Sequence, residues 1–234
     1  MSYSFLPLGK LDTKEAEASA CLWGNKARNL AILYQCGIPV PPAYVYPALS
    51  ISQMPWYQLW GILDEFGQVA VRSSGRYSMP GMMKTKLGVK NSLGIISAVI
   101  EVKASAFSEC CLEYKKLKGI PQQLETAVII QKFFPADNKM SCAGVCETAD
   151  SLTGEHNIVG GFARNVADNM YVVQDGYGME SIWRMPRRWL HQLQDAALYI
   201  ESIFQYPQDI EFLIINGELW IVQTRDLVFG KGDY

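Results

Sequence analysis

One stretch in the first third of the chain constrains the fold more than any other. Residues 69–71 are the apolar triplet Val-Ala-Val, which is typical of a buried strand, and Arg72 follows at once. Small, hydroxylated and glycine residues come next and lead into Ser-Met-Pro-Gly-Met-Met at positions 78–83. Backbone N–H groups in such a loop can surround an anion, while Arg72 and the hydroxyl groups add donors. An ordinary strand end followed by a polar turn fits the composition equally well.

The full string favours the first interpretation. It resembles the phosphate-binding loop of the pyruvate phosphate dikinase and phosphoenolpyruvate synthase family, in which Ser-Met-Pro-Gly-Met-Met is a hallmark. The resemblance implies that this loop covers the phosphates of ATP. It assigns Arg72, Ser78, Gly81 and Thr85 to the nucleotide site.

A second motif lies upstream, at the start of an expected helix over residues 26–36. Leu30, Leu33 and Tyr34 fall at helical spacing, and a glycine followed by prolines suits the end of this helix. Lys26 would then lie near the helix start, where the helix dipole and the unpaired N–H groups favour anions. A solvated lysine on a surface helix is the usual alternative.

The sequence around this lysine also resembles the family, which has Gly-Gly-Lys-Gly-x-Asn-Leu followed by Gly-x-Pro-Val-Pro-Pro. In that family the lysine contacts ATP phosphates, so the resemblance assigns Lys26 to the nucleotide. Asn25 and Ala27 replace two glycines of the pattern. Their side chains would either tighten or block the close approach of the backbone.

Near the C-terminus, two runs rich in apolar residues flank Asn216-Gly217, which is a strong hairpin signal. Asp209 and Glu211 are two residues apart, so a strand places both carboxylates on one face. Carboxylates on a rigid strand are suitable ligands for Mg²⁺ bound to nucleotide phosphates. A pair of exposed acids on an edge strand is the alternative, but the apolar flanks leave little polar surface on either face.

This region resembles the family's Gln-Asp-x-Glu-Phe and Leu-Trp-x-x-Gln-Thr-Arg motifs. The resemblance implies that Asp209 and Glu211 hold the metal and that Gln223 and Arg225 contact ATP. Arg72 and Arg225 would be the catalytic cations.

The turn of this hairpin decides whether the four polar side chains share a face. A two-residue Asn-Gly turn with unbroken pairing turns Gln223 away from the carboxylates. A three-residue loop ending at a left-handed Gly217 pairs Ile214 with Glu218 instead, and it brings Gln223 opposite Asp209. We therefore predict the three-residue, bulged loop.

A weaker match links these motifs. Residues 127–131 form a buried-strand pattern, and the resemblance assigns Gln131 to the nucleotide site. Ala149 stands in place of the arginine that the family has shortly before Thr-Gly-Glu, and Lys84 stands where the dikinases have an acid. These departures make full dikinase chemistry a weaker expectation than ATP binding.

Composition narrows the possible functions. The 234 residues are 49% hydrophobic, enough for a large core, and a net charge of −2 without a basic stripe argues against nucleic-acid binding. No apolar segment approaches the ~18 residues of a membrane helix, and no signal-peptide pattern is visible. We therefore expect a soluble, cytoplasmic protein without a membrane partner. The six cysteines form no Cys-x-x-Cys pair, so reduced thiols are expected rather than zinc.

The resemblance implies the ATP-grasp fold, an α+β fold of two lobes. We expect an N-terminal lobe over residues 1–126 with the phosphate-binding loop and a C-terminal lobe over residues 127–234 with the metal-binding hairpin. The patterning predicts helices at 26–36, 97–118 and 187–204. It predicts strands at 43–46, 69–72, 127–133, 142–147, 157–163, 170–174, 209–215 and 218–223.

Three functions remain open at this point. Complete enzymes of the family phosphorylate a histidine on a swivelling domain and pass the group to pyruvate on a TIM barrel, for which these 234 residues have no room. The first function is an ATP- and Mg²⁺-dependent phosphotransferase domain whose acceptor lies on another chain. The second is a nucleotide-binding regulatory or interaction module that has lost its chemistry. The third is a kinase of another small molecule or protein.

Overall fold

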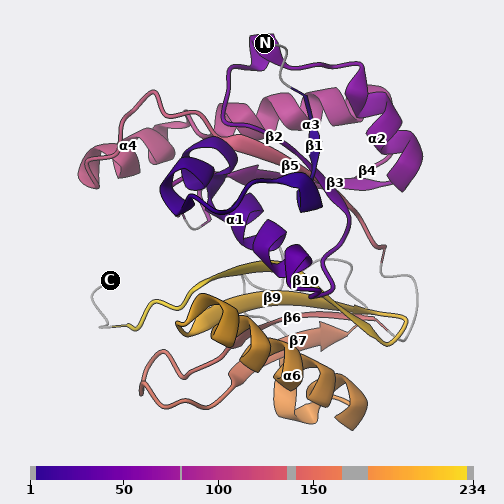
Figure 1. The fold of residues 1–234 in the computed structure, drawn as a ribbon, viewed down its shortest axis with the longest axis vertical. Helices are drawn as coiled ribbons and strands as arrows, with labels where there is room; N and C mark the ends of the chain where they lie inside the picture. The colour runs from indigo at the N-terminus through magenta and orange to yellow at the C-terminus, as the bar shows by residue number, and fades with distance from the viewer. Residues whose placement is uncertain (1–3, 80, 136–140, 165–178, 231–234) are drawn as a thin grey trace. The chain divides into compact units, whose positions relative to one another are not determined.

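The computed structural model describes residues 4–79, 81–135, 141–164 and 179–230. Contacts divide the chain into two units, and in the described residues each unit is built on one five-stranded sheet (Figure 1). The first unit contains Met1–Gln35 and Pro41–Phe133, and the second contains Cys36–Val40 and Phe134–Tyr234. All strand pairs in the described residues are antiparallel, so the chain is α+β.

The first sheet has the strand order β1-β2-β5-β3-β4. Its strands are β1 (Leu6–Pro7), β2 (Ala43–Tyr46), β3 (Val69–Ser74), β4 (Thr85–Val89) and β5 (Ala127–Lys132). The central strand, β5, is an apolar run in which every residue except the last is buried. This burial is expected for a strand that is covered on both faces.

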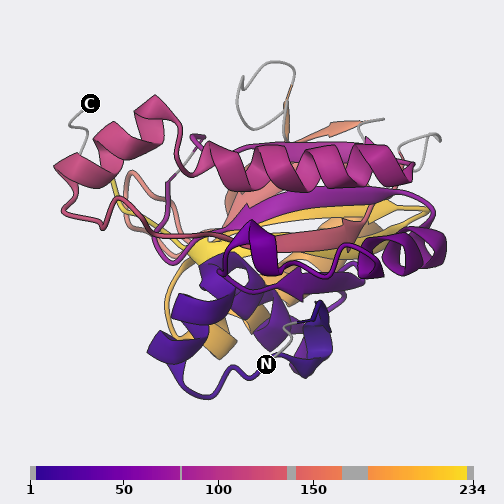
Figure 2. The same cartoon turned by 90° about the horizontal axis from the view of Figure 1, so that it is seen from above.

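Helices cover both faces of this sheet. They are α1 (Ala16–Gln35), α2 (Gln58–Phe66), α3 (Ser92–Ser105) and α4 (Glu109–Leu117), with short 3₁₀ turns η1 (Leu8–Lys10) and η2 (Ile51–Gln53). Apolar residues of α2 and α3 form one core with Val69 and Val71 of β3, while α1 packs on the other face (Figure 2). Because side chains alternate along a strand, Arg72 faces α1. No helix in the described part of the chain is both long and apolar enough to span a membrane.

The single helix expected over 97–118 is in fact two helices, α3 and α4, with a break between them. At the break, the fully buried Lys115 donates a hydrogen bond to the Ala106 carbonyl (2.8 Å) and to two further carbonyls at 3.2 and 3.3 Å. The spacing of apolar residues cannot predict this break, because it does not reveal a buried lysine that donates to backbone carbonyls at a helix end. The patterning also misses α2 and β4.

The second sheet has the order β10-β9-β6-β7-β8. Its strands are β6 (Cys142–Glu147), β7 (Val159–Arg164), β8 (Glu180–Ser181), β9 (Gln208–Ile215) and β10 (Glu218–Asp226), with the 3₁₀ turn η3 (Ile182–Arg184) and the helix α6 (Arg187–Phe204). α6 has the predicted bounds. It packs on β9 and β10, and its buried stripe at helical spacing is Trp189, Leu193, Ala197 and Ile200. The strand expected at 170–174 lies outside the described residues.

The boundary between the units differs from the one expected at 126/127. β5 pairs with β2 and β3, so it belongs to the first sheet, and the division follows Phe133. Residues 36–40 join the second unit, where the Pro39 carbonyl accepts a hydrogen bond from Ile221 N (2.8 Å). An apolar run predicts a buried strand but does not indicate which sheet the strand joins.

The hairpin between β9 and β10 also differs from the prediction. Ile215 pairs with Glu218 across a two-residue turn. Both turn residues have positive φ, 55° at Asn216 and 82° at Gly217, which is the geometry that Asn-Gly favours in a tight hairpin. The predicted three-residue loop is therefore wrong. The pairing shifts register farther along β10 instead, just before Gln223.

Candidate functional site

Arg72 lies on the face of the first sheet that packs against α1. Ser74, two residues farther along the same face, accepts a hydrogen bond at Oγ from Ala27 N of α1 (2.9 Å). Arg72 is only 3% exposed, and its Nε donates to Oε1 of Gln131 on β5 (3.2 Å). Two predicted site residues that are 59 positions apart in the sequence are thus in direct contact.

The side-chain amide of Gln131 has one usable orientation. Because an arginine side chain has no acceptor, Oε1 must face Arg72 and Nε2 must point away from it. Gln131 is 1% exposed, and Nε2 has no hydrogen-bond partner among the described residues. A buried donor without a partner costs about 1–3 kcal/mol. The contact with Arg72 therefore fixes the direction of a buried N–H donor, Nε2 of Gln131, that the described residues leave unused.

The start of the helical segment that carries Lys26 is docked on the end of β3. α1 is kinked at Gly24 (φ 72°, ψ 160°), where a Cβ atom would lie 2.1 Å from the Ser74 carbonyl oxygen. Lys26 lies in the first turn after this kink. The N–H groups of Asn25 and Ala27 donate to oxygens of the β3 end and the following loop, at 3.0 and 2.9 Å. These two N–H groups hold protein oxygens rather than forming the open anion site that the sequence suggests.

The loop between β3 and β4 (residues 75–84, the β3–β4 loop) carries the other predicted contacts of the first unit. Ser78 and Gly81 are exposed, and Gly81 has a left-handed φ of 69°. Thr85 begins β4 and pairs directly with Arg72, so the two side chains share a face. The first sheet thus brings Arg72, Gln131 and Thr85 to one face.

Two departures from the family pattern have clear structural counterparts. Lys84 and Lys86 lie 3.9 and 2.7 Å from the Glu101 carboxylate of α3. The hydrogen bond from Lys86 is the main cause that holds the pKa of Glu101 below its ordinary value. Ala149 is fully buried, so the position at which the family has an arginine carries no cation here.

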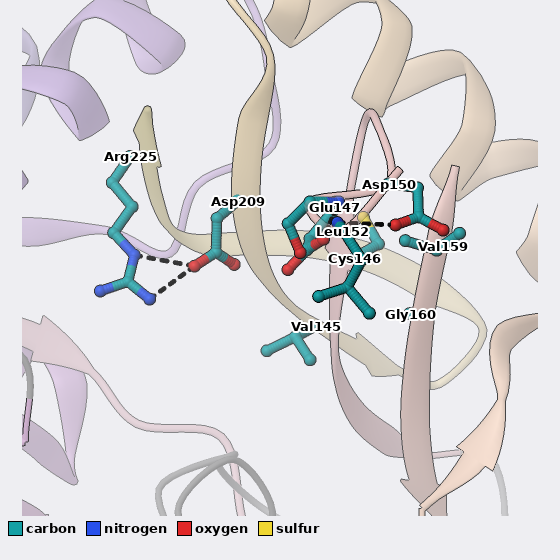
Figure 3. Close-up of a pocket in the computed structure, with 10 residues that line it drawn as sticks. Val145, Cys146, Glu147, Asp150, Leu152, Val159, Gly160, Asp209 and Arg225 are labelled. Carbon is teal, nitrogen blue, oxygen red and sulfur yellow. Dashed lines mark hydrogen bonds and ion pairs between the residues drawn. The ribbon is translucent and has the colours of Figure 1, made fainter. Parts of the chain in front are cut away.

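In the second unit, four predicted residues share one face of the β9–β10 hairpin. Beyond the register shift, Gln223 pairs with Glu211 and Arg225 with Asp209. Side chains directly opposite each other project to the same side of a sheet. Nη2 and Nε of Arg225 lie 2.6 and 2.7 Å from Oδ2 of Asp209 (Figure 3). The four side chains share a face as expected, although the predicted turn does not form.

The residue that makes this arrangement possible is Val222. The strand pairing skips it, and both it and its neighbour Ile221 are buried. Val222 packs with Ala143 and Leu213, and Leu213 shares its face of β9 with Glu211. One extra residue in a strand shifts the alternation of side chains by one position. Without this bulge, Gln223 would point to the face of the sheet opposite Glu211.

A third carboxylate, missed by the sequence analysis, adjoins this surface. Glu147 of β6 pairs with Asp209, and both line a cavity of about 420 Å³ together with Asp150 and Arg225 (Figure 3). Glu147 accepts a hydrogen bond at Oε2 from Ser151 N (3.2 Å). Alternation along the strand could have predicted its face, but only the pairing of β6 with β9 places it beside Asp209.

The side chains on this surface fit a magnesium ion held together with a nucleotide. Asp209 and Glu211 provide hard carboxylate oxygens, and Mg²⁺ in nucleotide sites usually takes one or two protein carboxylates, with phosphate and water completing the shell. Arg225 contacts one oxygen of Asp209. In the part of the chain that the structure describes, no group of three or more His, Cys, Asp or Glu side chains is arranged to hold a metal.

All six cysteines are free thiols. Cys21, Cys36 and Cys110 are exposed, and Cys111, Cys142 and Cys146 are buried. Burial raises the pKa of Cys142 to about 12 and also raises the pKa of Cys146. The two thiols of β6 therefore stay protonated and unreactive at neutral pH.

Solved structures identify the fold. A RimK domain protein ATP-grasp from Sphaerobacter thermophilus matches with a TM-score of 0.50 and 16% identity, over 91% of this chain and 62% of that one. The ADP complex of N5-carboxyaminoimidazole ribonucleotide synthetase matches with a TM-score of 0.52 and 11% identity, over 94% and 48%. The D-alanine-D-alanine ligase of Coxiella burnetii matches with a TM-score of 0.51 and 12% identity, over 90% of this chain and 49% of that one. The chain has the two-lobed α+β ATP-grasp fold.

Sequence comparison identifies the family within this fold. The family described as "Pyruvate phosphate dikinase, AMP/ATP-binding domain" matches residues 56–182, more than half of the chain, and the chain belongs to it. Pyruvate, phosphate dikinase of Rickettsia conorii is 31% identical over 140 residues, and that of Clostridium symbiosum is 30% identical over 136 residues. These matches cover 55% and 56% of this chain but only 16% and 15% of the dikinases.

A relative of another kind aligns with more of the chain. The prodigiosin synthesizing transferase PigC of Serratia marcescens is 22% identical, and the match covers 87% of this chain and 31% of that protein.

The residues matched by the family, 56–182, include the β3–β4 loop but neither Lys26 nor the β9–β10 hairpin.

Proposed function

We propose that this chain binds ATP together with Mg²⁺ and transfers a phosphoryl group to an acceptor on another chain, in the cytoplasm. The observation that carries this proposal is the bulge at Val222. It gathers two carboxylates, an amide and a guanidinium on one face of a rigid hairpin: Asp209, Glu211, Gln223 and Arg225. Phosphoryl transfer depends mostly on positioning and charge stabilisation, which this set of groups supplies.

Each predicted residue has a task in this proposal. Arg72 and Lys26 neutralise phosphate charge, and the contact with Gln131 fixes the plane of the Arg72 guanidinium before ATP arrives. The β3–β4 loop covers the phosphates. Asp209 and Glu211 would hold Mg²⁺, which neutralises charge on the phosphate oxygens when bound. Gln223 and Arg225 of β10 would donate to the phosphates.

Two observations favour a second function, a nucleotide-binding regulatory or interaction module. The buried Ala149 supplies no cation where the family has an arginine. Arg225 is already paired with Asp209 through a hydrogen bond from Nε and an ion pair at Nη2. A site with fewer cations available to the transferred group would bind ATP but turn it over slowly, if at all.

Nucleotide analysis separates the two functions. The purified protein is incubated with ATP and Mg²⁺, and the nucleotides are then separated by chromatography. AMP with phosphate indicates dikinase-type transfer, ADP indicates a simple kinase, and unchanged ATP with calorimetric binding indicates a module. An Arg72→Met variant purified in parallel reports contaminating ATPase. Absence of ATP binding with and without Mg²⁺ would contradict both functions.

A further inference from the structure

Asn25 occupies a junction between α1 and the β3–β4 loop. It follows the kink at Gly24. The Ser74 carbonyl lies so close to Gly24 that a side chain at position 24 would clash with it. The backbone N–H of Asn25 donates to the Gly75 carbonyl (3.0 Å). Any residue except proline could make that bond at position 25, because the bond uses only backbone atoms.

The side chain of Asn25 makes a further bond that depends on its identity. Its Nδ2 donates to the Arg76 carbonyl at 2.7 Å, across 51 positions of sequence. Arg76 lies two residues beyond the end of β3, so the bond holds the loop itself rather than the strand. Glycine, which the family pattern has at this position, cannot make it. The added side chain therefore tightens the close backbone approach rather than blocking it.

The loop is held from a second direction at the same residue. Nη2 of Arg76 lies 2.7 Å from Oε1 of Glu17, and its guanidinium lies 5.4 Å from the centroid of the Tyr77 ring. The ion pair is exposed, so it contributes little and exchanges readily. Farther along, the Met82 carbonyl accepts a hydrogen bond from the Cys111 thiol (3.6 Å). Asn25 thus holds the loop near its start, at Arg76, and Cys111 holds it near its end, at Met82.

We propose that Asn25 is a positioning residue that fixes the first turn of the β3–β4 loop for a nucleotide's phosphate groups. This inference rests on the proposed function. A loop ordered in advance loses less conformational entropy when its ligand binds, so the bond strengthens binding without touching the ligand. The bond should strengthen the binding of nucleoside di- and triphosphates but not of adenosine, because adenosine has no phosphate group for the loop to contact.

The test uses Asn25→Ala in the whole chain, with Gln35→Ala as the matched control. Gln35, at the other end of α1, also donates from its side-chain amide to a backbone carbonyl, that of Leu11 (3.0 Å). Hydrogen exchange over residues 76–79 is measured without nucleotide. Affinity for ATP, ADP and adenosine is then measured by calorimetry or NMR titration.

Asn25→Ala should speed exchange over 76–79 and weaken ATP and ADP binding by about two- to tenfold, the effect of one hydrogen bond. Its adenosine affinity should not change, and Gln35→Ala should alter none of these. Unchanged exchange in Asn25→Ala overturns the inference, and so does faster exchange with unaltered ATP affinity. If the parent protein does not bind ATP, the proposed function fails, while the exchange result still decides whether Asn25 anchors the loop.

Discussion

In the first unit, Arg72 and Gln131 lie buried on the face of the sheet that packs against α1, with 3% and 1% of their surfaces exposed. In the second unit, Asp209 and Glu211 are half-buried and Arg225 is exposed. Burial decides what a substitution changes. A buried polar group that loses its partner destabilises the fold, whereas a change at an exposed charge alters mainly ligand binding. The two polar surfaces should therefore respond differently to the same kind of substitution.

The largest expected effect is at the buried pair. Gln131→Met leaves Nε of Arg72 buried without its acceptor and should lower the free energy of unfolding by roughly 1.5–3 kcal/mol. Gln131→Glu keeps an acceptor for Arg72 and should cost less, yet it removes the Nε2 donor and should lose ATP affinity as Gln131→Met does. Denaturant unfolding and calorimetry measure the two quantities. Equal loss of stability in both variants would mean that the contact with Arg72 does not matter.

The next effect concerns the two cations of the first unit. Lys26→Ala and Arg72→Ala should each weaken ATP binding by about tenfold or more, because charge-assisted hydrogen bonds contribute roughly 1.5–3 kcal/mol. Arg72→Ala should also destabilise the fold, since it leaves Gln131 unpaired, whereas Lys26→Ala should destabilise it less. Calorimetric affinities equal to the parent's in both variants would remove these residues from the nucleotide site.

On the β9–β10 hairpin, a substitution should affect ATP affinity more than stability. Arg225→Met removes an ion pair whose arginine is 44% exposed, and it should change the free energy of unfolding by only about 0.2–1 kcal/mol. Its effect on ATP affinity should exceed its effect on stability. A loss of stability as large as that of Gln131→Met would erase the contrast between the two surfaces.

The smallest expected effect is a pH dependence of stability, which arises from Asp150 at the cavity. Hydrogen bonds from the backbone N–H groups of Thr153 and Leu152 hold the pKa of Asp150 below its ordinary value of 3.8. Because the folded pKa is lowered, ionised Asp150 stabilises the native state above pH 3.8, and this contribution is lost as the pH falls through the folded pKa. NMR titration of the carboxyl carbon measures it, with Asp150→Asn to assign the signal. Titration at or above 3.8 contradicts the assignment.

The sequence predicts well the elements whose signal is local. The predicted helix over 187–204 agrees with α6 at both ends, and Asn216-Gly217 correctly predicts where the hairpin turns. The predicted turn is wrong because a bulge at Val222, not a three-residue loop, brings Gln223 to the face that carries Asp209. Nothing local marks Val222 as the extra residue, since it looks like any apolar residue of a strand.

Features that depend on pairing between distant segments were beyond the sequence. Glu147 lies beside Asp209 only because β6 pairs with β9. The contact between Arg72 and Gln131 likewise requires β3 to pair with β5. Motif resemblance named most of the candidate residues, but the register of the sheets decides which of them meet.

The most direct test of the account is the effect of Mg²⁺ on ATP affinity, measured by calorimetry for the parent and for the double variant Asp209→Asn, Glu211→Gln. Without metal, the two carboxylates repel a triphosphate, so the parent should bind ATP more tightly when Mg²⁺ is present. The double variant should bind ATP equally well with and without Mg²⁺. A double variant that responds to Mg²⁺ as the parent does would contradict the assignment of these carboxylates to the metal.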